Sequence, residues 1–485
     1  MKAKKIFLDQ HGCAKNQVDG EILVTRLQKL GMELTSSPED ADLILVNSCG
    51  FIQSAKTESL NSLLAARNAY PNAKILLAGC LAERYAKDLE KNLPEADGIF
   101  GNGDLSKIDE VVESIFKNER PVLTPKQKGV CCGDRTTSLS FPGSSFVKIT
   151  EGCDNRCSFC AIPIIRGSLR SRAAVEIVDE IKSLVSSGIK EINLIGQDLA
   201  AYGCGKEDDV FGNGTNFYNE MYVSSKVPVI QSEFFKENHS PLYNLCKMIG
   251  RIEGKFWVRL LYIHPDHFNP DILEIMNADS RFLPYFDIPF QSGDSELIKK
   301  MNRKGSSSSY LEVASLIRKN LKENCIRTTF LTGFPGETEE NAVNTENFLK
   351  EVQSDWSGCF SYSREDDTPA AKMKNQVKTK LAQKRSSRLE EIQEKITEKR
   401  LKERVGKIYD VLIEEIVQNS DSENSDEGLA IGRAWFEAPE VDGNFVVRYD
   451  LDDENAVKNI QPGNFVKVRA LASSAVDLDG EYIGL

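Results

Sequence analysis

The sequence predicts an α/β protein with three parts: an N-terminal parallel α/β unit, a partial (βα)6 barrel and a small closed antiparallel β-barrel. Near the start of the chain, apolar strand-like runs alternate with helical stretches, which is typical of a parallel sheet covered by helices. The middle of the chain continues this alternation over six strands, fewer than the eight of a complete barrel. The last part has short β-like runs with turns between them, which indicate a small closed barrel. The expected parts are residues 1–140, 141–380, a connecting helix at 381–404, and 405–485.

Each of the first three predicted strands is followed by a cysteine. The strands are expected at 6–10, 43–48 and 75–79, with helices at 19–30 and 54–67 between them. Ligands of open parallel sheets bind beyond the carboxyl ends of the strands, so Cys13, Cys49 and Cys80 can converge there on a metal. The alternative is three buried core cysteines, because free cysteine is a common small hydrophobe. His11 either tunes such a metal site or is an ordinary strand-end histidine.

The central barrel strands are expected at 145–150, 192–196, 257–263, 285–290, 327–333 and 358–363. Helical stretches such as 174–187 and 310–321 provide the crossovers. Because barrel chemistry takes place at the carboxyl ends of the strands, polar residues there are candidate ligand contacts. They are Gln197, Asp198, His264, Gln291, the turn 333–337 and Arg364. Residues 204–240 are rich in Gly, Asn and acids and are predicted to be a surface insertion.

Charge is distributed unevenly along the chain. Residues 380–404 are predicted to form one solvated helix whose opposite charges pair along its surface, without a functional role. Residues 405–485 contain six basic and 17 acidic residues, which account for almost all of the net charge of −12. An acidic module of this kind attracts basic partners and repels phosphate backbones, or it serves only solubility.

The most specific motif is Cys153-Asp-Asn-Arg-Cys157-Ser-Phe-Cys160, which follows a predicted strand. Thiolates are soft ligands, and three at this spacing are typical of an iron–sulfur cluster with one iron left open to a small molecule. A structural zinc site normally has four ligands, often on two C-x2-C arms, and no second arm stands nearby. The motif therefore favours a four-iron cluster over zinc.

Composition indicates a soluble globular protein in the cytoplasm. Hydrophobic residues make up 40% of the chain, and no stretch approaches the roughly twenty apolar residues that a membrane span needs. We do not expect the N-terminus to be a signal peptide, because polar residues interrupt its short apolar run. Twelve cysteines without a secretory signal predict metal binding in a reducing compartment. The six outside the two triads are expected to be packed or surface residues, although the adjacent pair could bind metal. They are Cys131, Cys132, Cys204, Cys246, Cys325 and Cys359.

The second cysteine run resembles the signature of radical S-adenosylmethionine (radical SAM) enzymes. The resemblance implies that the open iron binds the amino and carboxylate groups of SAM, and that an electron from the cluster cleaves SAM to a 5′-deoxyadenosyl radical. Phe159 matches the aromatic residue that contacts adenine in that family. Gln197 is expected to contact the amino acid part of SAM. Gly333 and Gly336 are expected to let the backbone approach the adenosine, although tight turns alone also favour glycine.

The three parts together resemble the methylthiotransferases, in which the last domain is called TRAM. This resemblance covers the chain apart from the insertion, and it implies two [4Fe-4S] clusters and SAM as cofactors. One SAM methylates a sulfur at an auxiliary cluster, and the radical from a second SAM removes hydrogen from the carbon that receives the methylthio group. The auxiliary cluster matches Cys13, Cys49 and Cys80, and the SAM cluster matches Cys153, Cys157 and Cys160.

Two branches of that family differ in substrate. One modifies the β-carbon of an aspartate in small-subunit ribosomal protein S-twelve, and the other modifies an adenosine beside the tRNA anticodon. Four segments are similar to the ribosomal-protein branch: 12–21, 46–59, 361–371 and 432–443. Ser292 departs from it, because that branch often has histidine there. We expect a basic ribosomal protein docked by the acidic TRAM domain, an electron donor as a second partner, and no membrane contact. The tRNA substrate is less favoured, and a non-catalytic iron–sulfur docking module is the alternative of another class.

Overall fold

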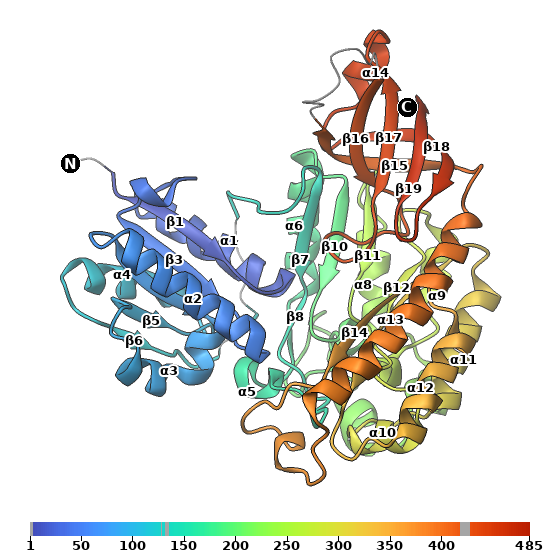
Figure 1. The fold of residues 1–485 in the computed structure, drawn as a ribbon, viewed down its shortest axis with the longest axis horizontal. Helices are drawn as coiled ribbons and strands as arrows, with labels where there is room; N and C mark the ends of the chain where they lie inside the picture. The colour runs from blue at the N-terminus through green and yellow to red at the C-terminus, as the bar shows by residue number, and fades with distance from the viewer. Residues whose placement is uncertain (1–2, 128, 131–134, 418–426) are drawn as a thin grey trace.

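The computed structural model describes residues 3–127, 129–130, 135–417 and 427–485. Figure 1 shows the three predicted parts: a sheet with helices near the N-terminus, a central barrel, and a small barrel near the C-terminus. The predicted α/β fold class is confirmed. Within the described ranges no helix has the length and apolar character needed to cross a membrane. Cys131, Cys132 and most of the acidic loop at 420–427 lie outside the described residues.

The first part is a six-stranded parallel sheet with strand order β2-β1-β3-β4-β5-β6. Its strands are β1 Lys5–Gln10, β2 Glu33–Leu34, β3 Leu43–Ser48, β4 Lys74–Gly79, β5 Gly98–Phe100 and β6 Val122–Leu123. Its helices are α1 Ala14–Lys29, α2 Gln53–Ala69, α3 Cys80–Asn92 and α4 Ile108–Phe116. The three strands that the sequence did not predict are two or three residues long, too short to show an apolar pattern.

Helix α1 begins at Ala14, five residues before the predicted start at Asp19. Its first turns are polar, yet Lys15, Asn16 and Asp19 are buried against the rest of the protein. A sequence pattern indicates a helix by its apolar face, so a helix that buries polar side chains is predicted too short. As a result Cys13 occupies the position immediately before the helix.

The central part consists of two three-stranded parallel sheets, β11-β10-β7 and β12-β13-β14, joined by a bridge between Val258 and Phe282. The strands are β7 Ser144–Lys148, β10 Glu191–Ile195, β11 Trp257–Leu260, β12 Tyr285–Asp287, β13 Cys325–Thr332 and β14 Trp356–Ser361. A ribbon of β8 Thr150–Glu151 and β9 Arg170–Ser171 precedes the crossovers. The helices are α5 Ile162–Arg166, α6 Ala174–Ser186, α7 Glu233–Glu237, α8 Pro241–Ile249, α9 Ile272–Ala278, α10 Ser295–Lys300, α11 Ser307–Asn320, α12 Glu339–Val352 and α13 Thr379–Lys402.

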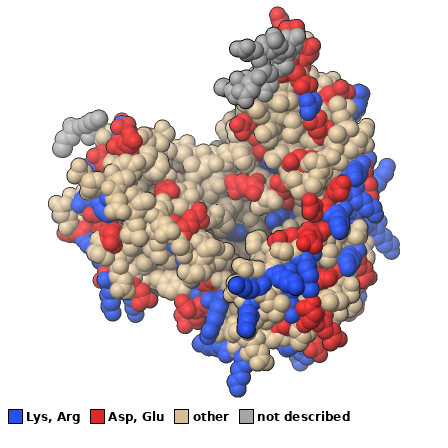
Figure 2. Space-filling model, in the orientation of Figure 1, with Lys and Arg blue, Asp and Glu red and all other residues tan. Residues whose placement is uncertain are grey.

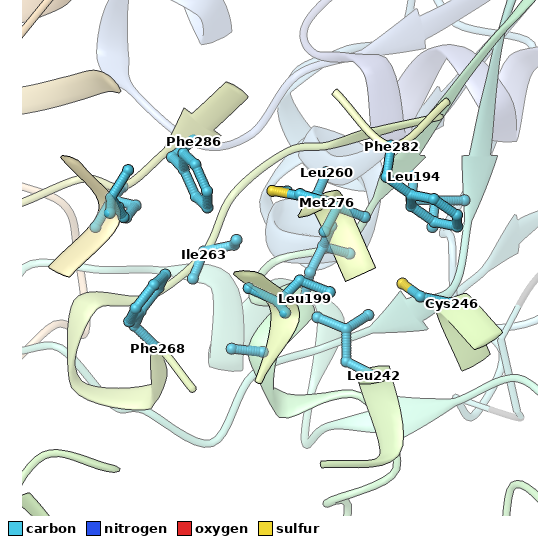
Figure 3. Packing of buried hydrophobic residues seen from close by; sticks show 14 of the residues in the cluster. Leu194, Leu199, Leu242, Cys246, Leu260, Ile263, Phe268, Met276, Phe282 and Phe286 are labelled. Atoms are coloured by element: carbon cyan, nitrogen blue, oxygen red, sulfur yellow. The ribbon is translucent and has the colours of Figure 1, made fainter. Parts of the chain in front are cut away.

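The barrel core is apolar and contains one of the additional cysteines. Figure 3 shows Cys246 and Leu242, both from α8, among Leu194, Leu260 and other buried side chains. Burial raises the pKa of the Cys246 thiol well above its ordinary value. Cys246 therefore behaves as a small hydrophobic residue, as its isolation in the sequence predicts.

The third part is a closed barrel with strand order β15-β16-β17-β19-β18. Its elements are β15 Ile408–Val417, β16 Glu427–Arg433, β17 Phe445–Asp450, α14 Glu454–Asn459, β18 Phe465–Ser473 and β19 Leu478–Gly484. Four of its pairings are antiparallel, as predicted, and β17 pairs with β19 in parallel. The sequence missed β19 because its two glycines and two acidic residues give little strand signal.

The small barrel covers the amino ends of the central strands. Trp257, the first residue of β11, packs on Phe465 with ring centroids 4.5 Å apart. Trp356, the first residue of β14, donates from Nε1 to the carbonyl oxygen of Phe436 at 2.9 Å. The small barrel thus closes one end of the central barrel, and the carboxyl ends of the strands remain for a site.

A buried ion network holds this junction. Glu191, the first residue of β10, lies 2.9 Å from Arg259 Nη2 and 2.6 Å from Arg433 Nη2. Arg433 also contacts Glu414 at 2.7 Å. Burial alone would raise the pKa of Glu191, but Arg433 and Arg259 hold it well below its ordinary value.

We expect Arg433→Met to destabilise the protein by about 3–5 kcal/mol, because it leaves Glu414 unpaired and Glu191 with one partner in a buried site. Urea denaturation followed by fluorescence would measure the loss. Arg448→Met is the matched control, since Arg448 forms an exposed pair with Asp479 at 2.8 Å. It should cost no more than about 1 kcal/mol. Equal losses in the two variants would contradict this account.

Candidate active site

The first cysteine triad lies at the carboxyl edge of the N-terminal sheet. Cys13 precedes α1, Cys49 follows β3, and Cys80 begins α3 directly after β4. Gly12 has φ +89°, and a Cβ there would lie 3.3 Å from Cys49 Sγ. Gly50 has a similar role, because a Cβ at this position would lie only 2.5 Å from the Cys80 carbonyl oxygen. The two glycines therefore let the cysteine-bearing loops approach one another.

Three polar side chains surround the Cys80 thiol. Arg166 Nη2 donates to Cys80 Sγ at 3.2 Å, and Asn102 Nδ2 donates at 3.4 Å. Cys80 Sγ itself lies 3.7 Å from Asn16 Oδ1. Burial raises the pKa of Cys80 to about 12. Cys13 is exposed, and nearby Lys15 and Arg166 bring the pKa of its thiol below the ordinary value.

The second triad lies in the loop between β8 and α5. Cys153 N–H donates to the Gly167 carbonyl at 3.1 Å, and Cys160 N–H donates to the Cys157 carbonyl at 3.0 Å. Cys157 Sγ lies 3.7 Å from His264 Nε2, at the end of β11. Burial raises the pKa of Cys157, which Arg303 partly offsets. The loop is therefore held by its own backbone and contacts His264 and Arg303 of the barrel.

The two triads lie where the carboxyl edge of the N-terminal sheet faces the carboxyl end of the central barrel. Cys80 packs in one apolar cluster with Ala161 and Ile165, which come directly after Cys160. On the other side, Lys15 Nζ lies 3.1 Å from the centre of the Tyr262 ring, beyond the end of β11. The carboxyl ends of the N-terminal sheet and of the central barrel therefore lie side by side.

In the described ranges, no three His, Cys, Asp or Glu side chains are close enough to bind one metal ion. A four-iron cluster has a different requirement, because each thiolate binds a separate iron atom. Two groups of three cysteines supply soft ligands for that arrangement. The donor sets therefore suit iron–sulfur clusters better than a single zinc ion.

The residues expected to contact SAM have different surroundings. Gln197, at the end of β10, has both amide atoms buried without a partner among the described residues. Phe159 packs beside a cluster that includes Phe334 and Ala370. Gly333 has φ +76°, and a Cβ there would lie 2.3 Å from Ala382, so α13 already explains this glycine. Gly336 has φ +80° and open space around it. Their contacts with SAM stay predictions.

Other predicted site residues form local pairs. Asp198 Oδ2 lies 2.6 Å from His267 Nδ1, and it accepts a hydrogen bond from Asn155 at 3.0 Å. His11 Nε2 lies 3.2 Å from Asp9, which is the largest contribution to the raised pKa of His11. Ser292 is buried with its hydroxyl 3.1 Å from that of Thr345. The role of His11 toward a cluster stays a prediction.

The insertion at 204–240 is not only a surface excursion. Met221 and Phe235 are buried in its own apolar cluster. Tyr222 packs edge-on against His267 at 5.1 Å between ring centroids. The insertion therefore lies against residues at the carboxyl end of the barrel and lines a cavity of about 630 Å³ beside the second cysteine loop.

Sequence reasoning missed the basic and amide residues around the thiols. Arg166 follows the second cysteine run by six residues, and Asn16 lies three residues after Cys13. On a helix that begins after Cys13, this spacing brings Asn16 back toward the cysteine. Asn102 and Arg303 have no such signal, because they come from distant segments.

Two segments that carry the family resemblance meet in space. Glu365, from 361–371, lies 2.8 Å from Lys56 Nζ, which belongs to 46–59. Arg84 Nη1 contacts the same carboxylate oxygen at 2.8 Å. Burial would raise the pKa of Glu365, but hydrogen bonds, led by that from Lys56, hold it below the ordinary value. This cluster attaches the end of the barrel to helices α2 and α3.

Three family descriptions match the chain in order. Residues 5–101 match "Uncharacterized protein family UPF0004", 147–349 match "Radical SAM superfamily", and 405–483 match "TRAM domain". Relatives named "Ribosomal protein uS12 methylthiotransferase RimO" match over the whole length. The one from Treponema denticola is 50% identical over 97% of this chain and 99% of its own. The one from Carboxydothermus hydrogenoformans is 35% identical over 99% of both chains.

Solved structures show a similar fold at low sequence identity. TsrM from Kitasatospora setae, a radical S-adenosylmethionine methyltransferase solved with tryptophan and a SAM analog, has a TM-score of 0.51. It is 13% identical and covers 76% of this chain and 75% of its own. The same protein solved with cobalamin and a [4Fe-4S] cluster also has a TM-score of 0.51, with 12% identity over 76% of this chain and 77% of its own.

The barrel, the cysteine loop at its carboxyl end and the family match define a radical SAM enzyme, whose cofactors are SAM and an iron–sulfur cluster. The full-length relatives narrow this class, and the chain belongs to the RimO family of methylthiotransferases. The resemblance predicted from the sequence is confirmed, and the relatives favour the ribosomal-protein branch over the tRNA branch and the non-catalytic module.

We expect Glu365→Ala to loosen the junction between the first sheet and the barrel, because it leaves Lys56 and Arg84 buried without their shared carboxylate. Breaking such a pair costs about 3–5 kcal/mol, so amides in 361–371 should exchange at least about a hundredfold faster. Hydrogen exchange followed by mass spectrometry measures this. Asp367→Asn, at an exposed neighbouring position, is the control and should leave exchange unchanged, because asparagine tolerates the φ of +63° found there. Unaltered protection in Glu365→Ala would disprove the role of this cluster.

Proposed function

We propose that this protein transfers a methylthio group to the β-carbon of an aspartate in ribosomal protein uS12. The observation that carries the proposal is the approach of the two cysteine triads, with Cys80 packed against Ala161 and Ile165 beside the second cysteine loop. Full-length similarity to relatives named for this activity supports it. The substrate is ribosomal, so we assign the activity to the cytoplasm.

We propose two [4Fe-4S] clusters, each bound by three cysteines. When bound, the clusters and SAM would supply the electron, the hydrogen-abstracting radical and the sulfur for the transfer. One donor set is Cys13, Cys49 and Cys80, and the other is Cys153, Cys157 and Cys160. Arg166 and Asn102 would donate hydrogen bonds to a thiolate of the first set. Such contacts orient metal ligands and alter their electron density.

We assign the binding of SAM to the carboxyl end of the barrel. The unpartnered amide of Gln197 would hydrogen bond to the amino acid part of SAM, which would satisfy its buried donor and acceptor. Phe159 would contact the adenine. The backbone at Gly336 has room for the adenosine, and Gly333 would line the same turn.

We propose that the acidic small barrel attracts the basic protein substrate. It covers the amino ends of the central strands, whereas the cysteine triads lie beyond the carboxyl ends. The eight residues of β13 alone span about 25 Å. A substrate held by the small barrel must therefore extend a loop along the outside of the central barrel.

We also propose that the chain is divided into domains at 1–140, 141–380, 381–404 and 405–485. Each of the three family matches falls within one of these domains.

We expect the variant Cys13→Ala/Cys49→Ala/Cys80→Ala to retain about half the iron of the parent after anaerobic reconstitution, since one of two clusters is lost. It should still form 5′-deoxyadenosine with dithionite but transfer no methylthio group. Cys246→Ala/Cys359→Ala is the control and should keep all the iron, because these cysteines lie in or beside the apolar core. Parental iron content in the triple variant would rule out the first cluster.

The substrate can be tested by intact mass spectrometry of uS12 from cells with and without the gene. We expect uS12 to lose the mass of one methylthio group, less one hydrogen, when the gene is deleted. Restoring the parent gene should restore the mass, and the triple cysteine variant should not. If uS12 is unchanged and the methylthio mark disappears from tRNA, the substrate is tRNA.

A further inference from the structure

A basic surface adjoins the second cysteine loop. Residues 368–389 contain seven basic and no acidic residues in a chain of net charge −12. This segment forms the loop at the lower edge of Figure 1 and the start of α13, and Figure 2 shows Lys and Arg side chains gathered there. Lys372 and Lys374 are exposed, and neither forms an ion pair with the described part of the chain.

Hydrogen bonds attach basic segments to Ser158, which lies between Cys157 and Cys160. Ala370 N–H donates to the Ser158 carbonyl at 2.8 Å, two residues before Lys372. From the other side, Ser158 Oγ donates to the carbonyl of Lys300 at 3.0 Å. Lys299 and Lys300 at the end of α10 are also exposed.

The exposed lysines Lys299, Lys300, Lys372 and Lys374, together with Arg156 in the cysteine loop itself, are called the basic surface below. Arg156 is exposed and has φ +50°. No ion pair of these five side chains occurs in residues 3–127, 129–130, 135–417 and 427–485. Unpaired cations on one surface attract an acidic partner and accelerate its association.

We propose that the basic surface docks an acidic one-electron carrier protein with a flavin or iron–sulfur centre. The inference rests on the proposed function, which requires an electron at the site of Cys153, Cys157 and Cys160. In the transfer, the centre of the carrier loses one electron and the site gains it, with no bond made or broken. Electron tunnelling slows steeply with distance, so a carrier must dock near these cysteines. Electron-transfer complexes use small interfaces, so a carrier needs only a limited docking surface.

Position favours a carrier over ribosomal RNA, the other polyanion that a basic surface attracts. The backbone of the segments that carry these lysines is hydrogen bonded to Ser158 of the cysteine loop. The acidic small barrel, which repels phosphate backbones, lies at the opposite end of the central barrel. A carrier at the basic surface would leave that barrel free for the basic substrate.

The test variant is Lys299→Glu/Lys300→Glu/Lys372→Glu/Lys374→Glu in the reconstituted full-length enzyme. The control, Lys87→Glu/Lys91→Glu/Lys247→Glu/Lys319→Glu, makes the same charge change at exposed lysines of α3, α8 and α11. The probe is reduced flavodoxin, an acidic flavin-carrying protein, at low ionic strength. Its oxidation is followed by stopped-flow absorbance, and its binding in the oxidised form by calorimetry.

In the test variant we expect the KM for flavodoxin to rise and its binding to weaken by about tenfold or more, whereas the control changes less than about twofold. Added salt should slow the parent and have little effect on the test variant. Formation of 5′-deoxyadenosine with dithionite, a small reductant that needs no docking, should match the parent and show that the fold is intact.

Equal flavodoxin binding and oxidation in the test and control variants would overturn the proposal. Weakened binding to ribosomal RNA with unchanged flavodoxin kinetics would assign the basic surface to RNA and also overturn it. Flavodoxin-driven 5′-deoxyadenosine formation without modification of uS12 in the parent would contradict the proposed substrate and leave the docking site supported.

Discussion

The meeting of the two sheets depends on four charged side chains that are almost fully buried. Lys148 Nζ lies 2.5 Å from Asp19 and 2.6 Å from Glu151, and Arg166 lies 2.9 Å and 2.5 Å from the same two carboxylates. Removing such charges from water costs several kcal/mol per ion. The attraction between the paired charges offsets this cost only while the short ion-pair distances are kept. Asp19 belongs to the first sheet's helix α1 and the other three to the barrel, so the network selects one orientation of the two parts.

The site geometry follows from that orientation. Arg166 is held by two carboxylates through one nitrogen and reaches Cys80 with the other. Arg166 lies in helix α5, which begins directly after the second cysteine loop. Arg166 therefore links the N-terminal part to the barrel, and it also links Cys80 to the loop that carries the second triad. The additional cluster of Lys56, Arg84 and Glu365 stabilises the same junction about one turn further along α3.

The two ends of the central barrel have different tasks. At the amino end, the small barrel contributes Arg433, which pairs with the buried Glu191, and this end is closed. At the carboxyl end, the cysteine loop, the insertion and the basic surface surround the site. Helix α13 connects these ends, because its 24 residues extend about 36 Å. Ala382 near its start packs at Gly333, and Arg404 just after it pairs with Asp355 at 2.9 Å.

The cysteine spacing and the strand rhythm were predictable, because both are local in the chain. Each of Cys13, Cys49 and Cys80 stands at a strand end, and the fold rule for parallel sheets then predicts one common edge. The start of α1 and strand β19 were not predicted, since buried polar residues and glycines hide the usual patterns. The contact of Glu365 with Lys56 was also inaccessible, because 309 residues separate them.

The sequence by itself therefore determined the three-part α/β fold, the two cysteine triads and the family. Only the tertiary structure decided that Arg166 and Asn102 reach Cys80, that the small barrel closes the amino end, and that unpaired lysines gather beside Ser158. The physical reason is how far apart in the chain the interacting residues lie. Periodicity and motif spacing record forces between near neighbours in the chain, whereas a buried charge or a surface patch depends on which distant segments the fold brings together.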